Sequence, residues 1–301
     1  MHETNCYLCG VNKPQILFAQ QGNDPYLNLV SKALHKIERN FVVCTQCGFV
    51  YRNPVLDSDE LSTLYERYDQ DVFAGSDSDT YFDKIITLPH DTSENWQKIN
   101  WLVQVLKKLD KKVENLAVLD IGCGGGTFLH TISERIKIDT LCGVELNSAY
   151  AELAARRLNA NILNETYTSG MFNNVFDLLT CTKVLEHVSD PLPFLKDMAS
   201  DLPQEGLIFL EVPDVSNLFN LPPDDSYFFI PHVYFFSTNT LSELISRVGF
   251  SVLESRVVNT SRNRTYLQVI ATKQHILSSS PPFDDPTRLE RRVVANLEQY
   301  Q

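Results

Sequence analysis

The chain has 301 residues, of which 43% are hydrophobic, so it can bury a full core and leave material for a second unit. Its 26 Lys and Arg against 38 Asp and Glu give a formal net charge of -12, which disfavours a nucleic-acid partner. The first residues lack a basic segment followed by an apolar one, and no apolar run reaches the roughly 18–20 residues that span a bilayer. We therefore expect a soluble, cytoplasmic protein without a membrane partner.

Four of the seven cysteines form two Cys-x-x-Cys pairs, a distribution that suits a reducing compartment. A glycine follows each pair and relieves a tight turn, which lets both thiolates of a pair face one metal ion. Because four thiolates suit tetrahedral Zn²⁺, we predict a structural zinc site, over the alternatives of redox dithiols or an incidental arrangement. The predicted ligands are Cys6, Cys9, Cys44 and Cys47. The remaining cysteines lie in apolar contexts typical of buried thiols: Cys123, Cys142 and Cys181.

Residues 1–57 hold both pairs and are predicted to form the zinc-binding module. Apolar residues at helical spacing between the pairs predict a helix that packs on the cysteine turns: Leu27, Val30, Leu34 and Ile37. The module has five Lys or Arg and four Asp or Glu, without a basic stripe. A structural or substrate-covering role is therefore favoured over nucleic-acid binding.

Residues 58–110 are predicted to form a linker and a covering helix. The stretch 58–92 is acidic and lacks clear periodicity, so we expect a linker that drapes over the active site. From Ser93 the pattern becomes helical, with one apolar stripe: Trp96, Ile99, Val103 and Leu106.

Residues 111–275 alternate short apolar strands with helices, which predicts a parallel sheet covered on both faces. The expected strands are 118–121, 141–145, 161–163, 177–181 and 207–212, and the expected helices follow Gly126, span 148–158 and follow Pro191. A further helix over 237–248 ends at Gly249. Two apolar runs then follow without room for another helix, which predicts a terminal antiparallel hairpin.

Residues 276–301 are expected to form a linker and a C-terminal helix. This helix stops abruptly, either because the chain is truncated there or because the helix serves self-association in a homodimer.

A glycine-rich segment marks the turn from the first expected strand of residues 111–275 into a helix. Glycines in such a turn let the backbone approach a ligand closely, while helix N–H groups point outward. The Gly-x-Gly-x-x-Gly pattern of dinucleotide-binding proteins fails at its third glycine, which is Thr127 or Leu129 depending on the start. The pattern present is Asp-x-Gly-x-Gly-x-Gly, followed by an acid at the end of the next strand, where it can accept hydrogen bonds from ribose hydroxyls. Its members are Asp120, Gly122, Gly124, Gly126 and then Glu145.

Over residues 96–273 the sequence resembles the class I S-adenosylmethionine (SAM) dependent methyltransferases, which implies a Rossmann-like α/β fold. In that family the glycine loop holds the methionyl part of SAM and the acid holds the ribose. The stretch 176–191 matches the region that ends beside the cofactor methyl. The alternative is a glycine-rich turn that serves only helix–strand packing. The resemblance implies this cofactor-binding set: Asp120, Gly122, Cys123, Gly124, Gly126, Glu145, Leu146, Asn164, Thr182 and Lys183.

The two cysteine pairs, the segment 49–54 and a SAM domain together look like the subfamily of sugar C-methyltransferases. These enzymes place an active-site histidine in a Glu-His-x-x-Tyr-x-Ser pattern, which His232 matches. Here Pro231 replaces the glutamate, the catalytic Tyr- and Ser-rich stretch matches poorly, and a further carboxy-terminal domain falls outside these residues. The resemblance implies a small or nucleotide-sugar substrate.

Three residues are candidates for catalysis. His187 follows the strand 177–181 and titrates near neutrality, so it could act as a base, or it could only cap or pair at a helix start. His232 is the second candidate, through the resemblance. Glu211 ends the strand 207–212 and could bind substrate hydroxyls or a cation, or cap a nearby turn.

Taken together, the sequence predicts a SAM-dependent methyltransferase that acts on a small or carrier-linked polar acceptor, such as a nucleotide sugar. One alternative is an O- or N-methyltransferase of another small metabolite. Another is a non-catalytic, zinc-containing scaffold with a methyltransferase fold.

Overall fold

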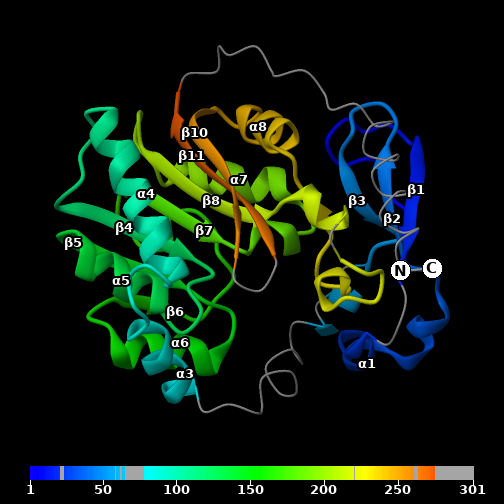
Figure 1. Ribbon diagram of the computed structural model, residues 1–301, viewed down its shortest axis with the longest axis horizontal. Coiled ribbons are helices and arrows are strands. Elements are labelled where there is room, and N and C mark those ends of the chain that lie inside the picture. The colour runs from blue at the N-terminus through cyan, green and yellow to red at the C-terminus, as the bar shows by residue number, and fades with distance from the viewer. Residues whose placement is uncertain are drawn as a thin grey trace.

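The computed structural model describes residues 1–20, 24–57, 59–61, 63–64, 78–219, 221–260 and 264–274. Within them lie two sheets (Figure 1): a seven-stranded sheet with helices on both faces and, beside it, a four-stranded sheet that includes the amino-terminal strands. The expected C-terminal helix falls outside the described residues.

The seven-stranded sheet has the order β10-β11-β8-β7-β4-β5-β6. Its strands are β4 (Leu116–Ile121), β5 (Ile138–Val144), β6 (Asn161–Leu163), β7 (Leu178–Thr182), β8 (Leu207–Pro213), β10 (Phe250–Asn259) and β11 (Thr265–Lys273). Strands β4 to β8 are parallel, and β11 inserts antiparallel between β8 and β10. The Rossmann-like sheet and its terminal hairpin are therefore as predicted.

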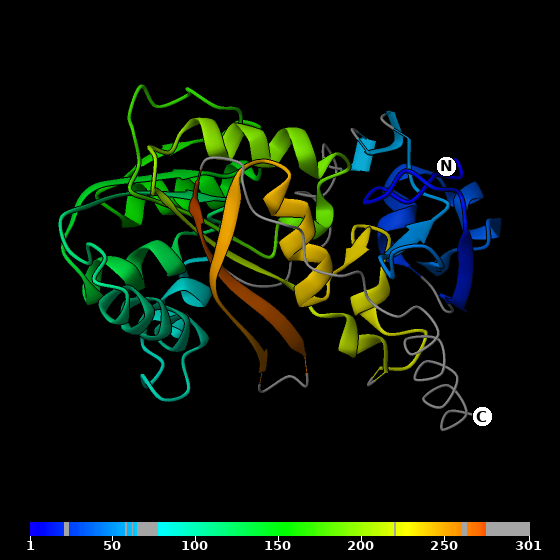
Figure 2. The ribbon, with the colours of Figure 1, turned by 90° about the horizontal axis from the view of Figure 1, so that it is seen from above.

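Helices cover the two faces of this sheet. On one face, α4 (Glu94–Lys108) and α5 (Thr127–Arg135) pack through residues such as Ile99 and Phe128. On the opposite face lie α7 (Pro191–Ser200) and α8 (Thr238–Ser246) (Figure 2). They contribute Leu195 and Leu241 to the core. Helix α6 (Ser148–Arg157) lies next to β6. Alternate residues of a strand point to opposite faces, so each buried strand contributes to both cores.

The prediction of one continuous helix between the cysteine pairs is wrong. The chain forms α1 (Pro25–Val30) and a short 3-10 helix, η1 (Lys32–Lys36), because Ser31 between them has an extended backbone. Leu27 and Leu34 pack with Leu56 and Ile230, not with the cysteines, and Ile37 is exposed. The apolar spacing thus matches a local cluster without a continuous helix.

The four-stranded sheet has the order β1-β2-β3-β9. Three strands flank the cysteine pairs and were not anticipated from the sequence: β1 (Pro14–Ala19), β2 (Asn40–Cys44) and β3 (Val50–Asn53). The fourth, β9 (Tyr234–Phe235), belongs to the segment between β8 and α8, together with the 3-10 helices η3 (Val215–Phe219) and η4 (Ser226–Phe228). The predicted module ends at residue 57 and so excludes this segment. The side chains of the segment nevertheless share a core with β1 and β2.

The covering helix forms as expected, with Ser93 as its N-cap, although Trp96 lies outside the core and stacks on His90. The preceding stretch includes helix α3 (Ser78–Ile86), which the sequence pattern did not reveal. Phe82 is its buried residue and contacts the ring of His130 on α5. Charge spacing explains the docking of α3, since Asp79 pairs with both Arg156 and Arg157 of α6.

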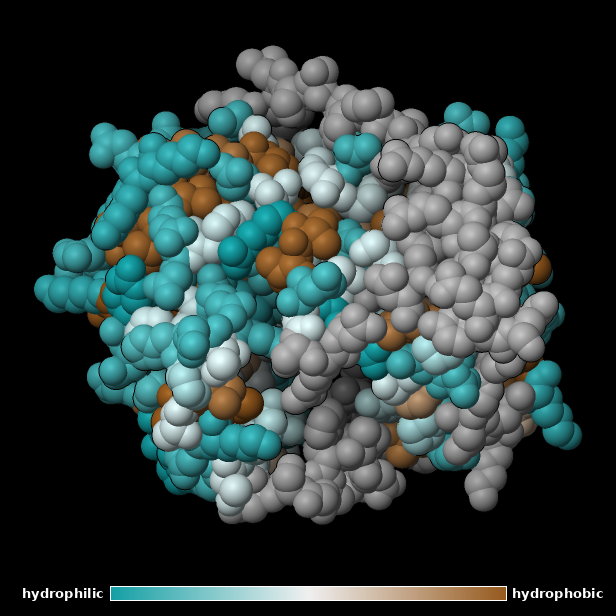
Figure 3. All heavy atoms as spheres, in the orientation of Figure 1, coloured by the Kyte–Doolittle hydropathy of each residue, from teal (hydrophilic) through white to brown (hydrophobic). Residues whose placement is uncertain are grey.

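The surface agrees with the acidic, polar composition. On the face seen in Figure 3, the part over the seven-stranded sheet is mostly hydrophilic, with separate small hydrophobic areas. Among the described helices, none has both the length and the apolar character needed to cross a bilayer.

Candidate active site

The glycine loop connects β4 to α5 at the carboxyl edge of the sheet. Gly122, Gly124 and Gly126 have φ angles of 73°, 53° and 86°, a left-handed backbone that disfavours other residues. A Cβ at Gly122 would lie 2.3 Å from Val184 Cγ2, whereas a Cβ at Gly124 would meet nothing within 4 Å. The loop is therefore packed from below at Gly122 and open at Gly124, where a ligand can approach the backbone.

The carboxylate of Glu145 faces this open loop. It follows β5 and accepts hydrogen bonds from the N–H of Gly124 and the N–H of Asn147, both at 2.8 Å. The neighbouring Leu146 is 52% exposed, which is unusual for a large apolar side chain and leaves it available to a flat ring. The amide of Asn164 donates to the carbonyl oxygens of Glu145 and Leu146 and so fixes the turn that carries both.

Two further predicted cofactor residues lie beneath the loop. Asp120 is buried and accepts a 2.6 Å hydrogen bond from the hydroxyl of Thr180 on β7. Burial raises the pKa of Asp120 to about 7. The thiol of Cys123 is also buried, which raises its pKa and keeps it protonated, and it lies where a side chain at Gly143 would have to be.

Thr182 ends β7 at the same edge of the sheet, and Lys183 follows it directly. Lys183 has a φ of 60°, and its N–H donates to the carbonyl oxygen of Glu211. Its ammonium lies 3.4 Å from a carboxylate oxygen of Glu94 and 4.4 Å from the centre of the Tyr266 ring. The amino-terminal turn of α4 therefore lies over the end of β7.

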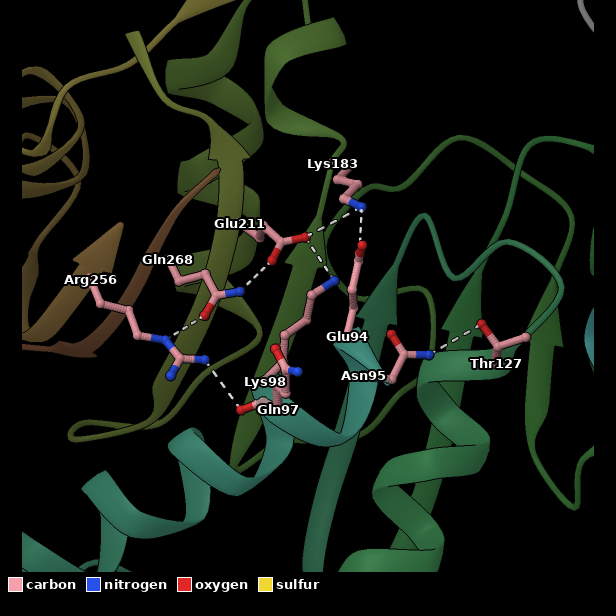
Figure 4. A network of polar contacts seen from close by, with 9 residues as sticks. All are labelled: Glu94, Asn95, Gln97, Lys98, Thr127, Lys183, Glu211, Arg256 and Gln268. Carbon is pink, nitrogen blue, oxygen red and sulfur yellow. Dashed lines mark hydrogen bonds and ion pairs between the residues drawn. The ribbon is translucent and has the colours of Figure 1, made fainter. Parts of the chain in front are cut away.

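Figure 4 shows that Glu211 points into a polar network built by α4, β8 and β11. Its carboxylate is 1% exposed, lies 2.7 Å from the ammonium of Lys98 and accepts a hydrogen bond from Gln268. Burial alone would raise the pKa of Glu211, but Lys98 and then Lys183 outweigh it and hold the pKa below its usual value. The carboxylate is thus ionised and engaged by side chains of this chain.

His187 and His232 come together although they lie on distant segments. His187 ends the 3-10 helix η2 (Leu185–His187), and His232 lies just before β9. Their ring centres are 4.8 Å apart. Nδ1 of His187 lies 2.8 Å from the carbonyl oxygen of Pro231, and Nδ1 of His232 lies 2.7 Å from that of Tyr227. Burial lowers the pKa of both imidazoles, and for His232 the second cause is His187.

The N-terminal unit holds the segment that carries His232. The guanidinium of Arg52 on β3 is fully buried and donates to the carbonyl oxygens of His232 and Phe229, at 3.2 and 3.0 Å, and to Gln20. Burial lowers the pKa of Arg52 to about 9. The cysteine-containing unit therefore contributes directly to the position of a candidate catalytic side chain.

The four paired cysteines converge on one point in this unit. The sulfurs of Cys6 and Cys47 are 3.5 Å apart, as are those of Cys9 and Cys44, and all four lie within 4.8 Å of one another. The other three cysteines are buried elsewhere, as predicted.

A cavity of about 260 Å³ lies between the N-terminal unit and the segment that leads into β9. Its lining includes Tyr7, Tyr51, Arg52 and Tyr234. The lining includes neither the glycine loop nor the histidine pair.

Several residues of the site were missed by the sequence analysis: Lys98, Thr180 and Gln268. They act through contacts between distant elements, and nothing in their local sequence marks them. Asn147 had a detectable signal, since an Asn before a helical run is a common N-cap, and its side chain caps α6.

Comparison with known proteins gives the family. A family model described as a methyltransferase domain matches residues 97–255. The chain is 26% identical over 165 residues to the tRNA U34 carboxymethyltransferase of Campylobacter jejuni, which covers 50% of this chain and 54% of that protein. It is 31% identical over 109 residues to the mitochondrial ubiquinone biosynthesis O-methyltransferase of Saccharomyces cerevisiae, covering 34% of this chain and 35% of that protein. The chain thus spans about half the length, or less, of these curated relatives.

Solved structures agree on the fold. The magnesium protoporphyrin IX methyltransferase of Synechocystis with bound SAH superposes with a TM-score of 0.51 at 14% identity, covering 71% of this chain and 99% of that one. The family match spans slightly more than half of the 301 residues. The protein therefore belongs to the methyltransferase domain family and has the Rossmann-like fold of the SAM-dependent methyltransferases.

Proposed function

We propose that this protein transfers the methyl group of SAM to a small or carrier-linked polar acceptor, such as a nucleotide sugar. The observation that carries the proposal is the Glu145 carboxylate beside the open backbone at Gly124. A carboxylate at the end of the second parallel strand and a bare turn that opens a helix together suit a nucleoside with an amino-acid tail.

The residues present fit this cofactor. Gly122, Gly124 and Gly126 would hold the methionyl part, with Asp120 and Cys123 supporting the loop from below. Glu145 would accept hydrogen bonds from the ribose hydroxyls, and Leu146 and Asn164 would border the adenine. Thr182 and Lys183 would lie beside the reacting end. When bound, SAM supplies a methyl group activated by the positive sulfonium.

Most of the rate enhancement in such a displacement can come from positioning, with a base needed where the acceptor atom holds a proton. His187 and His232 are the candidate base or substrate-orienting groups, because their lowered pKa values keep them neutral and able to accept a proton. Glu211 is engaged by Lys98 and Gln268, so we assign it a positioning role for the turn after β7.

We also propose a structural zinc ion at the four paired cysteines. Tetrahedral zinc with Zn–S bonds of about 2.3 Å places its sulfurs about 3.8 Å apart, and the two closest pairs here are 3.5 Å apart. The donor set and the convergence fit this metal. Its role would be to hold the turns from which β2 and β3 extend toward the segment of His232.

The chemical class of the acceptor is part of this proposal, and so is the atom that receives the methyl group. The relatives named above act on tRNA and in ubiquinone biosynthesis, and the net charge of -12 supports a small acceptor over a nucleic acid. An O- or N-methyltransferase is the alternative activity, and a scaffold that binds no SAM is the non-catalytic one. A cytoplasmic location and a homodimer remain predictions of the sequence.

The test is a screen of the purified full chain with methyl-labelled SAM against nucleotide sugars, small alcohols, phenols and tRNA. Label in a sugar is the expected result, and its position identifies carbon, oxygen or nitrogen. Calorimetric titration with SAM and SAH runs in parallel. Absence of binding in that titration would overturn the assignment as a methyltransferase, whereas binding with label only in tRNA would overturn the acceptor class.

A further inference from the structure

We propose that Glu186, His187 and His232 form a binding site for one divalent transition-metal ion, distinct from the four-cysteine cluster. One ligand atom of each of these three side chains lies within 4.8 Å of the other two. This site goes beyond the methyl transfer proposed above, and its occupancy can be measured without any acceptor.

The two imidazoles are held in the protonation form that a metal requires. Carbonyl oxygens only accept hydrogen bonds, so the Nδ1 atoms next to the carbonyls of Pro231 and Tyr227 must carry the hydrogens. In a neutral ring, Nε2 then carries the lone pair. Metal-binding histidines are commonly oriented in this way, by a carbonyl or carboxylate at the other ring nitrogen.

Glu186 supplies the negative charge. Its side chain is 1% exposed, and its Oε2 has no hydrogen-bond partner among the described residues. A buried carboxylate oxygen without a partner is costly, and a bound cation would remove that cost. Lys183 lies near enough to influence this carboxylate electrostatically, but its ammonium contacts Glu94 and Glu211 instead.

The backbone fixes the three ligands relative to one another. The N–H of Val233 donates to the carbonyl oxygen of Glu186 at 2.9 Å, which joins the segment of His232 to η2. Arg52 anchors the other side of His232 through its carbonyl oxygen. These hydrogen bonds hold the backbone of Glu186 and the backbone of His232 in place.

The donor set indicates which metals fit. Two imidazole nitrogens and one carboxylate suit Zn²⁺, Mn²⁺, Fe²⁺ or Co²⁺, whereas Ca²⁺ and Mg²⁺ prefer oxygen ligands. Bonds of about 2.0–2.2 Å allow ligand atoms to be at most about 4.4 Å apart, which is slightly less than the 4.8 Å limit here. Three protein ligands leave at least one coordination position open. An oxygen of the methyl acceptor could take that position, and this part rests on the proposed function.

Mn²⁺ is the probe for the test, because it favours nitrogen and oxygen ligands and leaves the cysteine cluster to zinc. Free Mn²⁺ gives a six-line electron paramagnetic resonance signal, so the signal lost on adding full-length protein counts the bound ions. We expect one Mn²⁺ per chain, with zinc content unchanged by elemental analysis. Pulsed measurements on the bound ion should show coupling to histidine nitrogens.

Variants assign the ligands. Glu186→Gln keeps the side-chain size, and His232→Asn keeps a nitrogen donor at the position of Nδ1. Each should weaken Mn²⁺ binding by at least tenfold, since loss of even an outer-shell partner costs about 10–100-fold. His90→Asn is the matched control, because His90 is exposed, its ring stacks on Trp96, and it is not one of the three proposed ligands. Circular dichroism confirms that each variant folds, and if His232→Asn does not fold, Glu186→Gln carries the comparison.

Two outcomes would overturn the proposal. One is a wild-type protein that binds no Mn²⁺ at millimolar concentration, and the other is bound Mn²⁺ without histidine nitrogen coupling. SAM titrations of the same samples separate the two hypotheses. SAM binding without Mn²⁺ binding leaves the methyltransferase assignment intact and removes the metal site, and Mn²⁺ binding without SAM binding does the reverse.

Discussion

The carboxylate of Glu145 accepts a hydrogen bond of 2.8 Å from the N–H of Gly124, and this contact joins the end of β5 to the glycine loop after β4. It places a negative charge at the one position of the loop where a side chain would meet no neighbour within 4 Å. Removing the charge of Glu145 is therefore expected to affect ligand binding at this loop.

Glu145→Gln should weaken SAM binding by about 10–100-fold, because hydrogen bonds to a charged acceptor contribute about 1.5–3 kcal/mol. Calorimetric titration measures the loss. Glu205→Gln is the control, since Glu205 lies on the surface and pairs with Lys111. Equal SAM affinity for wild type and Glu145→Gln would place the ribose elsewhere.

Gly122→Ala should lower the free energy of unfolding by about 2–4 kcal/mol, because it combines a left-handed backbone with a clash against Val184. Gly170→Ala separates these causes, since Gly170 has a φ of 81° but no neighbour within 4 Å. That control should cost only about 1–2 kcal/mol. Urea denaturation measures both values, and adding Val184→Ala to Gly122→Ala should recover part of the loss. No recovery would mean that the clash does not contribute.

Lys98→Met should destabilise the protein by about 3–5 kcal/mol, because it removes the closest cation from the buried Glu211. Lys111→Met removes an exposed pair with Glu205 and should change stability little. Thermal and urea unfolding compare the two variants. If they behave alike, water must reach Glu211 and the network in Figure 4 is weaker than its burial implies.

Asp120 should make stability fall as the pH rises. The pKa of its carboxyl is 3.8 in the unfolded chain and about 7 in the folded protein. Between these pH values the native state therefore binds more protons than the unfolded state. Relative to Asp120→Asn, the wild type should therefore lose about 2–3 kcal/mol between about pH 5 and about pH 8. Urea denaturation at both pH values tests this, with the exposed Asp139→Asn as control. A pH-independent difference between Asp120→Asn and wild type would show that Asp120 ionises normally.

Cys44→Ser should release the zinc and unfold the N-terminal unit, since a structural zinc contributes on the order of 10–16 kcal/mol of binding energy in finger peptides. A chromophoric chelator counts the zinc that each protein holds. Cys142→Ala should retain one zinc per chain, because Cys142 lies on β5, away from the cluster. A Cys44→Ser protein that keeps its full zinc content would exclude this ligand set.

The terminal hairpin and α3 show how far the sequence pattern reaches. The hairpin was predictable because two long apolar runs follow each other without room for a helix between them. So short a connection favours antiparallel pairing, as seen between β10 and β11. Helix α3 was not predicted; its first turn is acidic, and Phe82 is its buried residue. Its partners lie on other helices, with Phe82 against α5 and Asp79 paired with α6, and such partners leave no local signal.

The sequence by itself determined the class of the protein. The spacing of Asp120, the three glycines and Glu145, and the alternation of strands with helices, follow from local backbone requirements and from the periodicity of buried residues. The two cysteine pairs predicted that four thiols converge for the same reason, because a tight turn is a local feature, and the zinc ion itself stays a proposal.

Only the tertiary structure decided which side chains meet. Strand β9 joins the N-terminal sheet, Arg52 supports the segment of His232, and His232 reaches His187 and Glu186. The charge of Glu211 on β8 is balanced by Lys98 on α4. These contacts depend on how distant segments pack. Burial exists only after that packing has formed, and burial sets both the pKa values and the need of a polar group for a partner.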